Sequence, residues 1–149
     1  MVGKSRREVL VLGAGGAALA MAGGVADATP QEAAAAIAKF TGGMPAGQGK
    51  ISIDLPEIAE NGNTVPLTIT VDSPMTAEDH VSDILVVAEA NPRPTVVTFH
   101  LTPMSGRAEA ATRIRLAATQ NVVVVARTSK GQFIIAQKPV KVTVGGCGG

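Results

Sequence analysis

The sequence predicts an all-β protein, an immunoglobulin-like β-sandwich of about seven strands, and three observations support this. From Lys50 onward, short apolar runs alternate with Gly, Pro, Asn and Asp residues, as in strands joined by turns. Within several runs every second residue is apolar, which is typical of strands with one buried face. The length of 149 residues suits one domain with a core. A β-barrel is the alternative architecture.

Residues 1–28 have the features of an export signal that is cleaved. Arg6 and Arg7 precede an apolar run rich in Gly and Ala, and a small-x-small cleavage motif lies at residues 26–28. The paired arginines are typical of a twin-arginine signal, although Val9 stands where such signals often have Phe. A membrane anchor is the alternative, but the run is weakly hydrophobic and short for a span of about 20 residues. We therefore expect an exported mature chain that has no membrane contact after cleavage.

Residues 29–49 are predicted to form a short N-terminal helix and a linker. Thr29 suits the position before a helix, and Pro30 is favoured at the first helical position. An alanine-rich stretch continues to Phe40, and Gly42-Gly43 should end the helix.

The sandwich domain is expected over residues 50–144. The stretch 122–126 is apolar on both faces, which predicts a central strand. The last strand contains Pro139, which lacks a backbone donor and therefore predicts a sheet edge or a bulge. The predicted strands cover residues 51–55, 65–71, 80–90, 94–101, 107–117, 122–126 and 132–144.

Composition and charge argue against several classes of function. With three Phe, no Trp and no Tyr, the chain lacks aromatic platforms for nucleic-acid bases. Residues 29–149 contain as many basic as acidic side chains, so no charged partner is indicated. We expect structural roles for His80 and His100, because a metal site needs three or four converging ligands. The carboxylates, including Asp83, lie mainly in or beside predicted loops and are expected to be solvated. The sequence thus predicts neither a metal nor a cofactor.

The single cysteine, Cys147, is the most informative residue of the chain. It lies two residues from the C-terminus and has two glycines on either side, namely Gly145, Gly146, Gly148 and Gly149. Glycine adds no bulk and restricts the backbone little, so residues 145–149 are predicted to form a flexible arm. A lone cysteine has no intramolecular disulfide partner. An ordinary thiol has a pKa of about 8.5 and is about 3% thiolate at pH 7, which favours a handle for partner enzymes over a catalytic nucleophile.

Three segments of the sequence resemble the SoxY family of thiosulfate-oxidation proteins. They read QKPVKVTVGGCGG (Gln137 to Gly149), AENGNTVPLTITVDSP (Ala59 to Pro74) and ANPRPTVVTFHLTP (Ala90 to Pro103). The resemblance covers most of the predicted mature chain, and the GGCGG ending combined with these loops is highly specific. It implies an immunoglobulin-like fold, twin-arginine export to the periplasm and a tight heterodimer with SoxZ.

The resemblance also implies a role for Cys147 as the covalent attachment point of sulfur intermediates. In the family, a haem enzyme oxidatively joins thiosulfate to the cysteine, and a manganese hydrolase releases sulfate. A sulfane dehydrogenase is a further partner that acts on the remaining sulfur. The carrier itself is not an enzyme and holds no haem, metal or flavin.

Three other functions are weighed against the carrier hypothesis. An exported structural sandwich could dimerise through a disulfide between two copies of Cys147. A terminal Gly148-Gly149 could carry sulfur as a thiocarboxylate, but that chemistry needs ATP, which the exported compartment lacks. A thiol peroxidase has the least support, because neither a resolving cysteine nor an activating cation lies nearby in the sequence.

Overall fold

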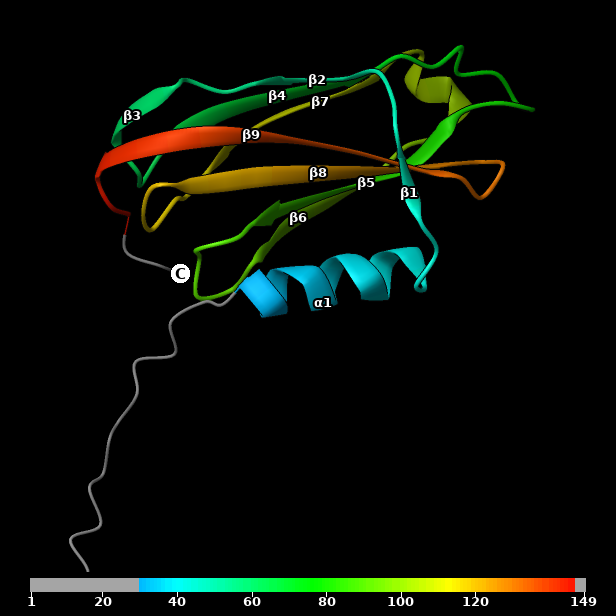
Figure 1. Ribbon diagram of the computed structural model, residues 1–149. Coiled ribbons are helices and arrows are strands. Elements are labelled where there is room, and N and C mark those ends of the chain that lie inside the picture. The colour runs from blue at the N-terminus through cyan, green and yellow to red at the C-terminus, as the bar shows by residue number, and fades with distance from the viewer. Residues whose placement is uncertain (1–29, 147–149) are drawn as a thin grey trace, which may run out of the picture.

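The computed structural model describes residues 30–146 and confirms the predicted all-β class. Within this range one α-helix, one 3₁₀ turn and nine strands form three layers, seen edge-on in Figure 1. Helix α1 covers a six-stranded sheet, which packs on a three-stranded sheet. The elements are α1 (Pro30–Thr41), β1 (Ala46–Gln48), β2 (Ile51–Asp54), β3 (Ile58–Asn61), β4 (Val65–Val71), β5 (Val81–Ala88), β6 (Thr95–His100), η1 (Pro103–Ser105), β7 (Ala108–Ile114), β8 (Gln120–Thr128) and β9 (Phe133–Val144).

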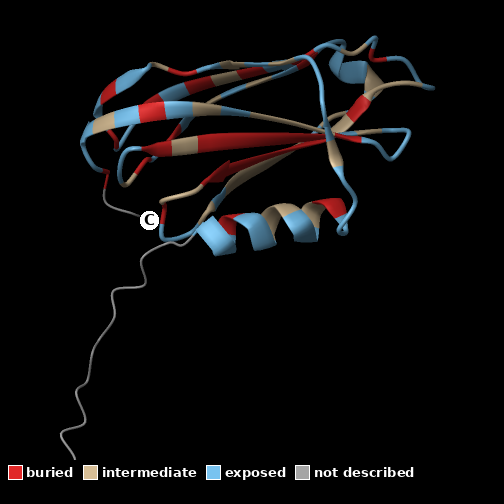
Figure 2. Ribbon diagram, viewed as in Figure 1, coloured by how far each residue is buried: buried red, intermediate tan, exposed pale blue. Residues whose placement is uncertain are grey.

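The larger sheet has the order β1-β9-β8-β5-β6, with β3 also paired to β9, and the smaller sheet has the order β2-β4-β7. The main core lies between the two sheets, and Figure 2 shows buried residues along the strands, most densely in β5 and β8. Strand β4 shows the pattern most clearly, since its inward residues are buried while Pro66 and Thr70 are exposed. The two-residue alternation that predicted half-buried strands is thus confirmed here. The inward residues of β4 are Val65, Leu67, Ile69 and Val71.

Strand β8 contributes to two cores at once, because both of its faces are covered. Val122 and Val124 belong to the core between the sheets, whereas Val123 and Val125 belong to a second core beneath α1. In the sheet, β8 lies between β5 and β9. The central position predicted from the continuous apolar run is therefore confirmed.

Helix α1 begins at Pro30 and packs its apolar side on the outer face of the larger sheet. Ala33 is buried there, and the rings of Phe40 and Phe133 meet edge to face with centroids 5.8 Å apart. The helix ends where Gly42 and Gly43 adopt φ angles of 64° and 80°. The Gly43 amide donates to the Ala38 carbonyl oxygen over 3.0 Å, which is the C-terminal cap that glycine favours.

Two short strands, β1 and β3, were not expected from the sequence. Both pair in parallel with β9: residues 46–48 join its beginning, and residues 58–61 join its end. Neither segment shows an apolar alternation, because each is a short ladder along β9 that adds only one small apolar residue to a core, Ala46 in β1 and Ala59 in β3. The segment 29–49, predicted as a helix and a linker, therefore also includes a strand, and residues 30–146 contain nine strands instead of the expected seven.

Pro139 lies where the sequence predicted a sheet edge. On one side of β9 it stands opposite Asn121 of β8. On the other side, β1 pairs with residues 133–135 and β3 with residues 141–144, so Pro139 falls between the two ladders. The missing donor of proline is tolerated because no described strand pairs with this stretch of the outer edge.

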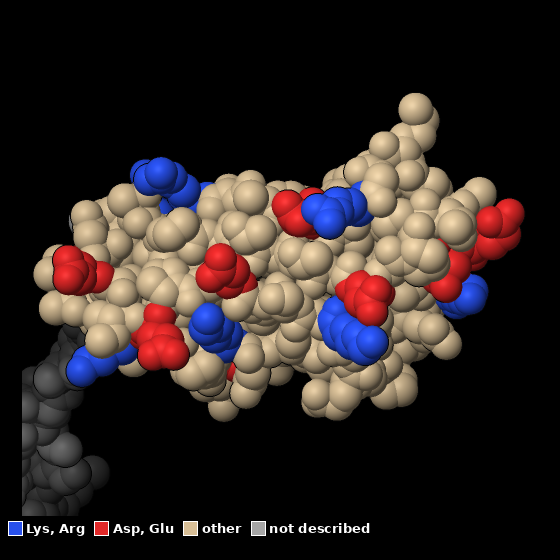
Figure 3. All heavy atoms as spheres, turned by 90° about the horizontal axis from the view of Figure 1, so that it is seen from above, with Lys and Arg blue, Asp and Glu red and all other residues tan. Residues whose placement is uncertain are grey.

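Charged side chains of both signs are mixed on the face of the smaller sheet. Figure 3 shows this face from above, with no region dominated by one sign. Lys50 and Asp72 form a surface ion pair there, with Nζ and Oδ2 3.4 Å apart. No helix within residues 30–146 has the length and apolar character needed to cross a bilayer. The predicted export signal, with Arg6 and Arg7, lies outside the described residues.

Candidate functional site at the base of the cysteine-bearing arm

The chain does not leave the sandwich when β9 ends at Val144. The Gly62 amide donates to the Val144 carbonyl oxygen (2.8 Å), and the Leu116 amide donates to the Gly62 carbonyl oxygen (2.8 Å). The Gly146 amide then donates to the Leu116 carbonyl oxygen (2.9 Å). Three segments that are far apart in the sequence are thereby joined through their backbones. We call Gly62, Leu116 and Ala117 the arm seat.

The arm seat approaches Gly145 and Gly146 so closely that neither position has room for a side chain. A Cβ atom on Gly145 would overlap the Ala117 carbonyl oxygen, and one on Gly146 would lie 2.7 Å from the Gly62 carbonyl oxygen. A Cβ atom on Gly62 would likewise overlap the Leu116 carbonyl oxygen. At these positions glycine is required for close backbone contact.

This packing differs from the expectation of one flexible arm over residues 145–149. Gly146 is buried, and both Gly145 and Gly146 belong to the packed end of the sandwich. Cys147, Gly148 and Gly149 lie outside the described residues. The sequence could not reveal the difference, because glycine is compatible with both a free hinge and a tight contact.

Two buried amide side chains hold the loop that contains Leu116 and Ala117. Asn91 donates through Nδ2 to the Arg115 carbonyl oxygen (2.8 Å) and accepts through Oδ1 from the Ala117 amide (2.9 Å). Gln120 donates through Nε2 to Asn91 Oδ1 (2.9 Å) and to the Ala118 carbonyl oxygen (2.9 Å). Loop 115–119 is therefore fixed by side chains that come from outside it.

Further contacts tie the two amides and the loop to neighbouring strands. Gln120 Oε1 accepts from the Ala90 amide over 2.8 Å. Thr119 Oγ1 accepts from the Val142 amide of β9 over 2.9 Å. Asn91 and Gln120 are only 9% and 8% exposed, so their hydrogen bonds replace water that cannot reach them. These contacts join loop 115–119 to the ends of its neighbouring strands.

A shallow hollow adjoins this end of the larger sheet. It runs over β9 next to the beginning of α1, and Thr119 and Gln120 line it together with Pro30. Its charged lining residues are of both signs, namely Glu57, Glu89, Lys138 and Lys141.

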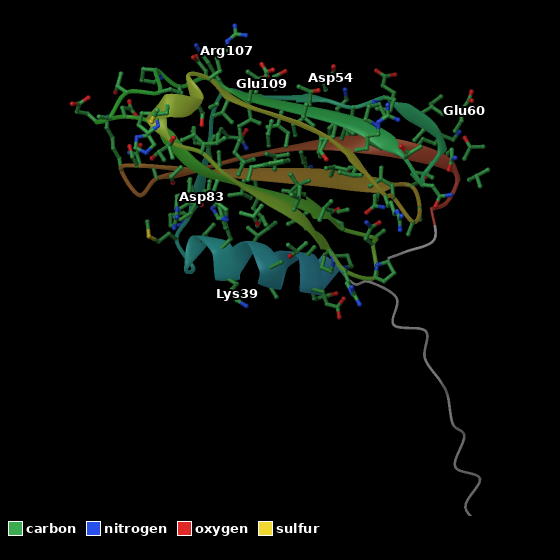
Figure 4. The ribbon with its side chains drawn as sticks, turned by 180° about the vertical axis from the view of Figure 1, so that it is seen from behind. Lys39, Asp54, Glu60, Asp83, Arg107 and Glu109 are labelled. Carbon is green, nitrogen blue, oxygen red and sulfur yellow. The ribbon has the colours of Figure 1, made fainter. Side chains whose placement is uncertain are left out.

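A second polar cluster lies on the helix-facing side of the same sheet, far from the arm seat. Asp83 on β5 stands opposite His100 of β6 and Arg127 of β8 in the sheet register. His100 Nδ1 lies 2.5 Å from Asp83 Oδ1, and Arg127 Nε donates to Asp83 Oδ2 over 2.8 Å. Ser82 Oγ also donates to Oδ2, over 2.7 Å. Figure 4 shows Asp83 at the sheet, whereas Lys39 of α1 points away from it.

Asp83 is an ion-paired carboxylate in this cluster. Burial by itself would raise the pKa of Asp83, but hydrogen bonds from Ser82, His100 and Arg127, with the charge of Arg127, outweigh burial and lower it. The expectation that the carboxylates are solvated is thus wrong for Asp83. Nothing in the sequence indicated a carboxylate next to His100. Asp83 is that neighbour, because the pairing of β5 with β6 brings the two residues together.

The other predicted histidine lies in a surface turn. His80 Nδ1 is 3.0 Å from the Thr76 carbonyl oxygen. Within residues 30–146, no three side chains of His, Cys, Asp or Glu are placed to share a metal ion.

Comparison with known proteins identifies the family. The sequence profile of the sulfur oxidation protein SoxY matches residues 37–147, a range that includes both the arm seat and Cys147. The chain belongs to the SoxY family. A solved structure of the sulfur carrier protein SoxY from Chlorobium limicola f thiosulfatophilum is 34% identical, with a TM-score of 0.65. That alignment covers 78% of this chain and 100% of the other. A search of the curated proteins finds no match.

More distant structures share the fold of this SoxY-family chain. The superoxide reductase (neelaredoxin) from Ignicoccus hospitalis is 15% identical, with a TM-score of 0.56 over 62% of this chain and 80% of that one. The hypothetical protein PH1083 from Pyrococcus horikoshii is 14% identical, with a TM-score of 0.51 over 69% of this chain and 98% of that one. At these identities the likeness concerns the sandwich alone.

Asn91 and Gln120 are the residues of this SoxY-family site that sequence reasoning missed. Asn91 lies in a segment that resembles the family, and Gln120 precedes the apolar run of β8. The sequence held one weak signal: each of these polar amides stands next to the apolar run of a strand, β5 for Asn91 and β8 for Gln120, where a buried side chain could be expected. Their partners include each other, 29 residues apart, and backbone groups up to 30 residues away, so spacing could not identify them.

Proposed function

We propose that this protein is a periplasmic sulfur carrier of thiosulfate oxidation that holds intermediates covalently on Cys147. The family match carries this proposal, because it extends to residue 147 and the chain has a single cysteine. The name of the Chlorobium relative as a sulfur carrier supports the same role. The protein is then a substrate for partner enzymes, with no cofactor of its own.

The geometry of the arm seat agrees with a carrier. Gly146 is anchored next to Leu116, beyond the last ladder of β9, so the remaining residues start from a fixed point at one end of the sandwich. Cys147 directly follows Gly146, so the Cα atoms of the two residues are about 3.8 Å apart. A partner enzyme must therefore approach this end of the sandwich closely to receive Sγ of Cys147.

The residues that contact Gly145 and Gly146 most closely are uncharged, which favours a handle over a catalytic thiol. The arm seat residues Gly62, Leu116 and Ala117 carry no charge. A nucleophilic cysteine needs a nearby cation or base that stabilises its thiolate. In our proposal, that activation is supplied by the partner enzyme.

The carrier chemistry balances when partner enzymes supply the redox step. The Cys147 thiol loses its proton, an S–S bond forms between Sγ and the outer sulfur of thiosulfate, and two electrons pass to a haem enzyme. A manganese hydrolase then adds water across the bond to the sulfonate group, which leaves as sulfate. A persulfide remains on Cys147, and a sulfane dehydrogenase is the proposed partner for its oxidation.

Membership of the SoxY family implies a partner from the Sox system, such as SoxZ. We propose a stable heterodimer with SoxZ, formed after twin-arginine export and removal of residues 1–28. Co-purification of SoxZ from the periplasmic fraction tests both statements. Lysine substitutions at Arg6 and Arg7 should keep the chain in the cytoplasm if the export route is correct.

Intact mass spectrometry gives the direct test of the carrier role. Protein purified from cells oxidising thiosulfate should carry sulfur adducts that map to Cys147 and disappear with reductant. The Cys147→Ser variant should fold, carry no adduct and support no thiosulfate-dependent activity in the reconstituted system. Full activity of Cys147→Ser would exclude the proposal.

A structural dimer joined through Cys147 is the competing function. It predicts a disulfide-linked dimer on non-reducing gels that persists throughout turnover. On the same gels a carrier instead predicts mainly chains without a covalent link to a second copy, because a stable disulfide would block loading of the thiol.

A further inference from the structure

We propose that Asn91 and Gln120 are positioning residues for the cysteine-bearing arm. By fixing loop 115–119, they keep the arm seat in place, and the arm seat docks Gly145 and Gly146. The arm then has a short docked form and a longer released form. This inference deepens the proposed function and rests on it, since it concerns where Cys147 is presented.

The first step concerns the peptide groups around Leu116. Its amide is bound to the Gly62 carbonyl oxygen, and its carbonyl oxygen receives the Gly146 amide. The Leu116 side chain is 0% exposed in the core between the sheets, so this residue cannot shift without disturbing the core. Docking of Gly146 therefore uses an acceptor residue that is held by its own amide and by its buried side chain.

The second step concerns the loop on either side of Leu116. Residues 115–119 form no strand or helix, so their backbone groups need other partners. Asn91 and Gln120 satisfy three of these groups, on Arg115, Ala117 and Ala118. The Ala117 amide belongs to the same peptide group as the Leu116 carbonyl oxygen, so Asn91 orients this acceptor directly. Without the two amides, the Leu116 side chain stays anchored in the core, but this peptide group loses the partner that fixes its orientation.

The third step concerns the fit between the arm seat and the arm. The Ala117 carbonyl oxygen occupies the space that a Gly145 side chain would need. Gly62 and Gly146 exclude side chains on each other in the same way. The arm seat therefore leaves no space for an alanine side chain at position 145 or 146. A purely flexible hinge would not need such a close fit.

Docking changes how far the thiol extends from the sandwich. An extended residue spans about 3.3 to 3.6 Å, so release of Gly145 and Gly146 adds roughly 7 Å to the reach of Cys147. The released form therefore enters deeper active sites than the docked form. In our proposal, Asn91 and Gln120 set the balance between the two forms through loop 115–119.

Hydrogen exchange at the Gly146 amide of the reduced full-length mature chain tests the proposal without any substrate. We expect this amide to exchange roughly fivefold more slowly than that of Gly148, the factor that corresponds to about 1 kcal/mol for a net hydrogen bond. Asn91→Ala should remove this protection. Asn121→Ala is the matched control, because its amide bonds to Glu89 instead of the loop, and protection should persist. An unprotected Gly146 in the native protein, or full protection in folded Asn91→Ala, would overturn the inference.

A second pair of variants remains decisive even if Asn91→Ala fails to fold. A nitroxide attached to Cys147, the single cysteine, reports the motion of the arm. Gly145→Ala should expel the arm from its seat and shorten the rotational correlation time, whereas Gly148→Ala should leave it equal or longer. A longer or unchanged correlation time in Gly145→Ala would show a simple hinge and sink the proposal. Loss of the carrier role itself would appear separately, as missing sulfur adducts with Gly146 still protected.

Discussion

The two polar clusters on the larger sheet differ in what their hydrogen bonds hold. At the arm end, Asn91 and Gln120 are neutral amides that bind backbone groups of a loop. At the other end, Asp83 binds the side chains of His100 and Arg127 on neighbouring strands. The first cluster shapes a loop, and the second links three strands that the backbone ladder already joins.

Chemistry explains this division. An amide side chain both donates and accepts, so it can replace the missing partners of an irregular backbone segment. A carboxylate only accepts and needs positive donors when buried, so it gathers cations. We therefore expect changes at the arm end to alter how Cys147 is presented. Changes at the Asp83 end should alter stability and its dependence on pH.

The largest contrast is expected for sulfur loading. Cys147→Ser should abolish sulfur adducts completely, because no other thiol is present in the chain. Asp83→Asn should keep full loading when measured below its unfolding temperature, since Asp83 lies away from the arm seat. Mass spectrometry after incubation with thiosulfate and the partner enzymes compares the two variants. Loss of loading in folded Asp83→Asn would contradict the separation of the two clusters.

Removal of the Asp83 carboxylate should produce the largest loss of stability. Asp83→Ala deletes charge-assisted hydrogen bonds to a side chain that is only 7% exposed, and we expect a cost of about 3 kcal/mol. Urea unfolding measures the free energy. Asp79→Ala is the control: its pair with Lys130, 3.3 Å apart, is at the surface and should be worth less than about 1 kcal/mol. Equal losses in both variants would refute the distinction.

Asn91→Ala should cost somewhat less, about 2 kcal/mol, because it leaves the Ala117 amide and the Arg115 carbonyl without their partner. Asn121→Ala, which removes one hydrogen bond to Glu89, should cost less than half as much. Thermal unfolding of both variants gives the comparison. If the two variants unfold alike, the amides at the arm end do not stabilise loop 115–119.

A smaller effect is expected from acid. Because the pKa of Asp83 is lowered in the folded state, its stabilising contribution is fully present above the unfolded value of about 3.9. The contribution is lost as pH falls through the lower folded value. Arg127 and His100 are 46% and 78% exposed, so solvent screening keeps the effect modest. The stability difference between the wild-type protein and Asp83→Asn should therefore shrink below pH 4, and a difference that grows there would show the opposite shift.

The smallest effect is expected at η1, away from both clusters. Met104 is 97% exposed, so Met104→Ser removes little buried surface and should change stability by less than about 0.5 kcal/mol. Calorimetry should detect no clear shift in Tm. A loss above 1 kcal/mol would mean that burial in the monomer does not describe this residue's environment in solution.

Much of the fold could be predicted because alternation and turn residues are local signals. Strand β4 lies where its pattern placed it, at Val65–Val71, and α1 begins at Pro30 as its helix-start residues indicated. β1 and β3 were missed because parallel edge pairing with β9 leaves no local pattern. Asp83 was misjudged for a related reason, since its partners come from two other strands.

The sequence by itself determined the all-β class, the central position of β8 and the choice of Cys147 as the candidate functional residue. These conclusions follow from residue types and spacings that need no knowledge of distant neighbours. Only the tertiary structure decided that Gly145 and Gly146 are docked, and that Asn91 and Gln120 build the loop that receives them. Hydrogen bonds between residues so far apart in the chain exist only once the strands have paired. For this reason the sequence predicted that Gly145 and Gly146 form a flexible hinge, whereas the structure shows them packed against the arm seat.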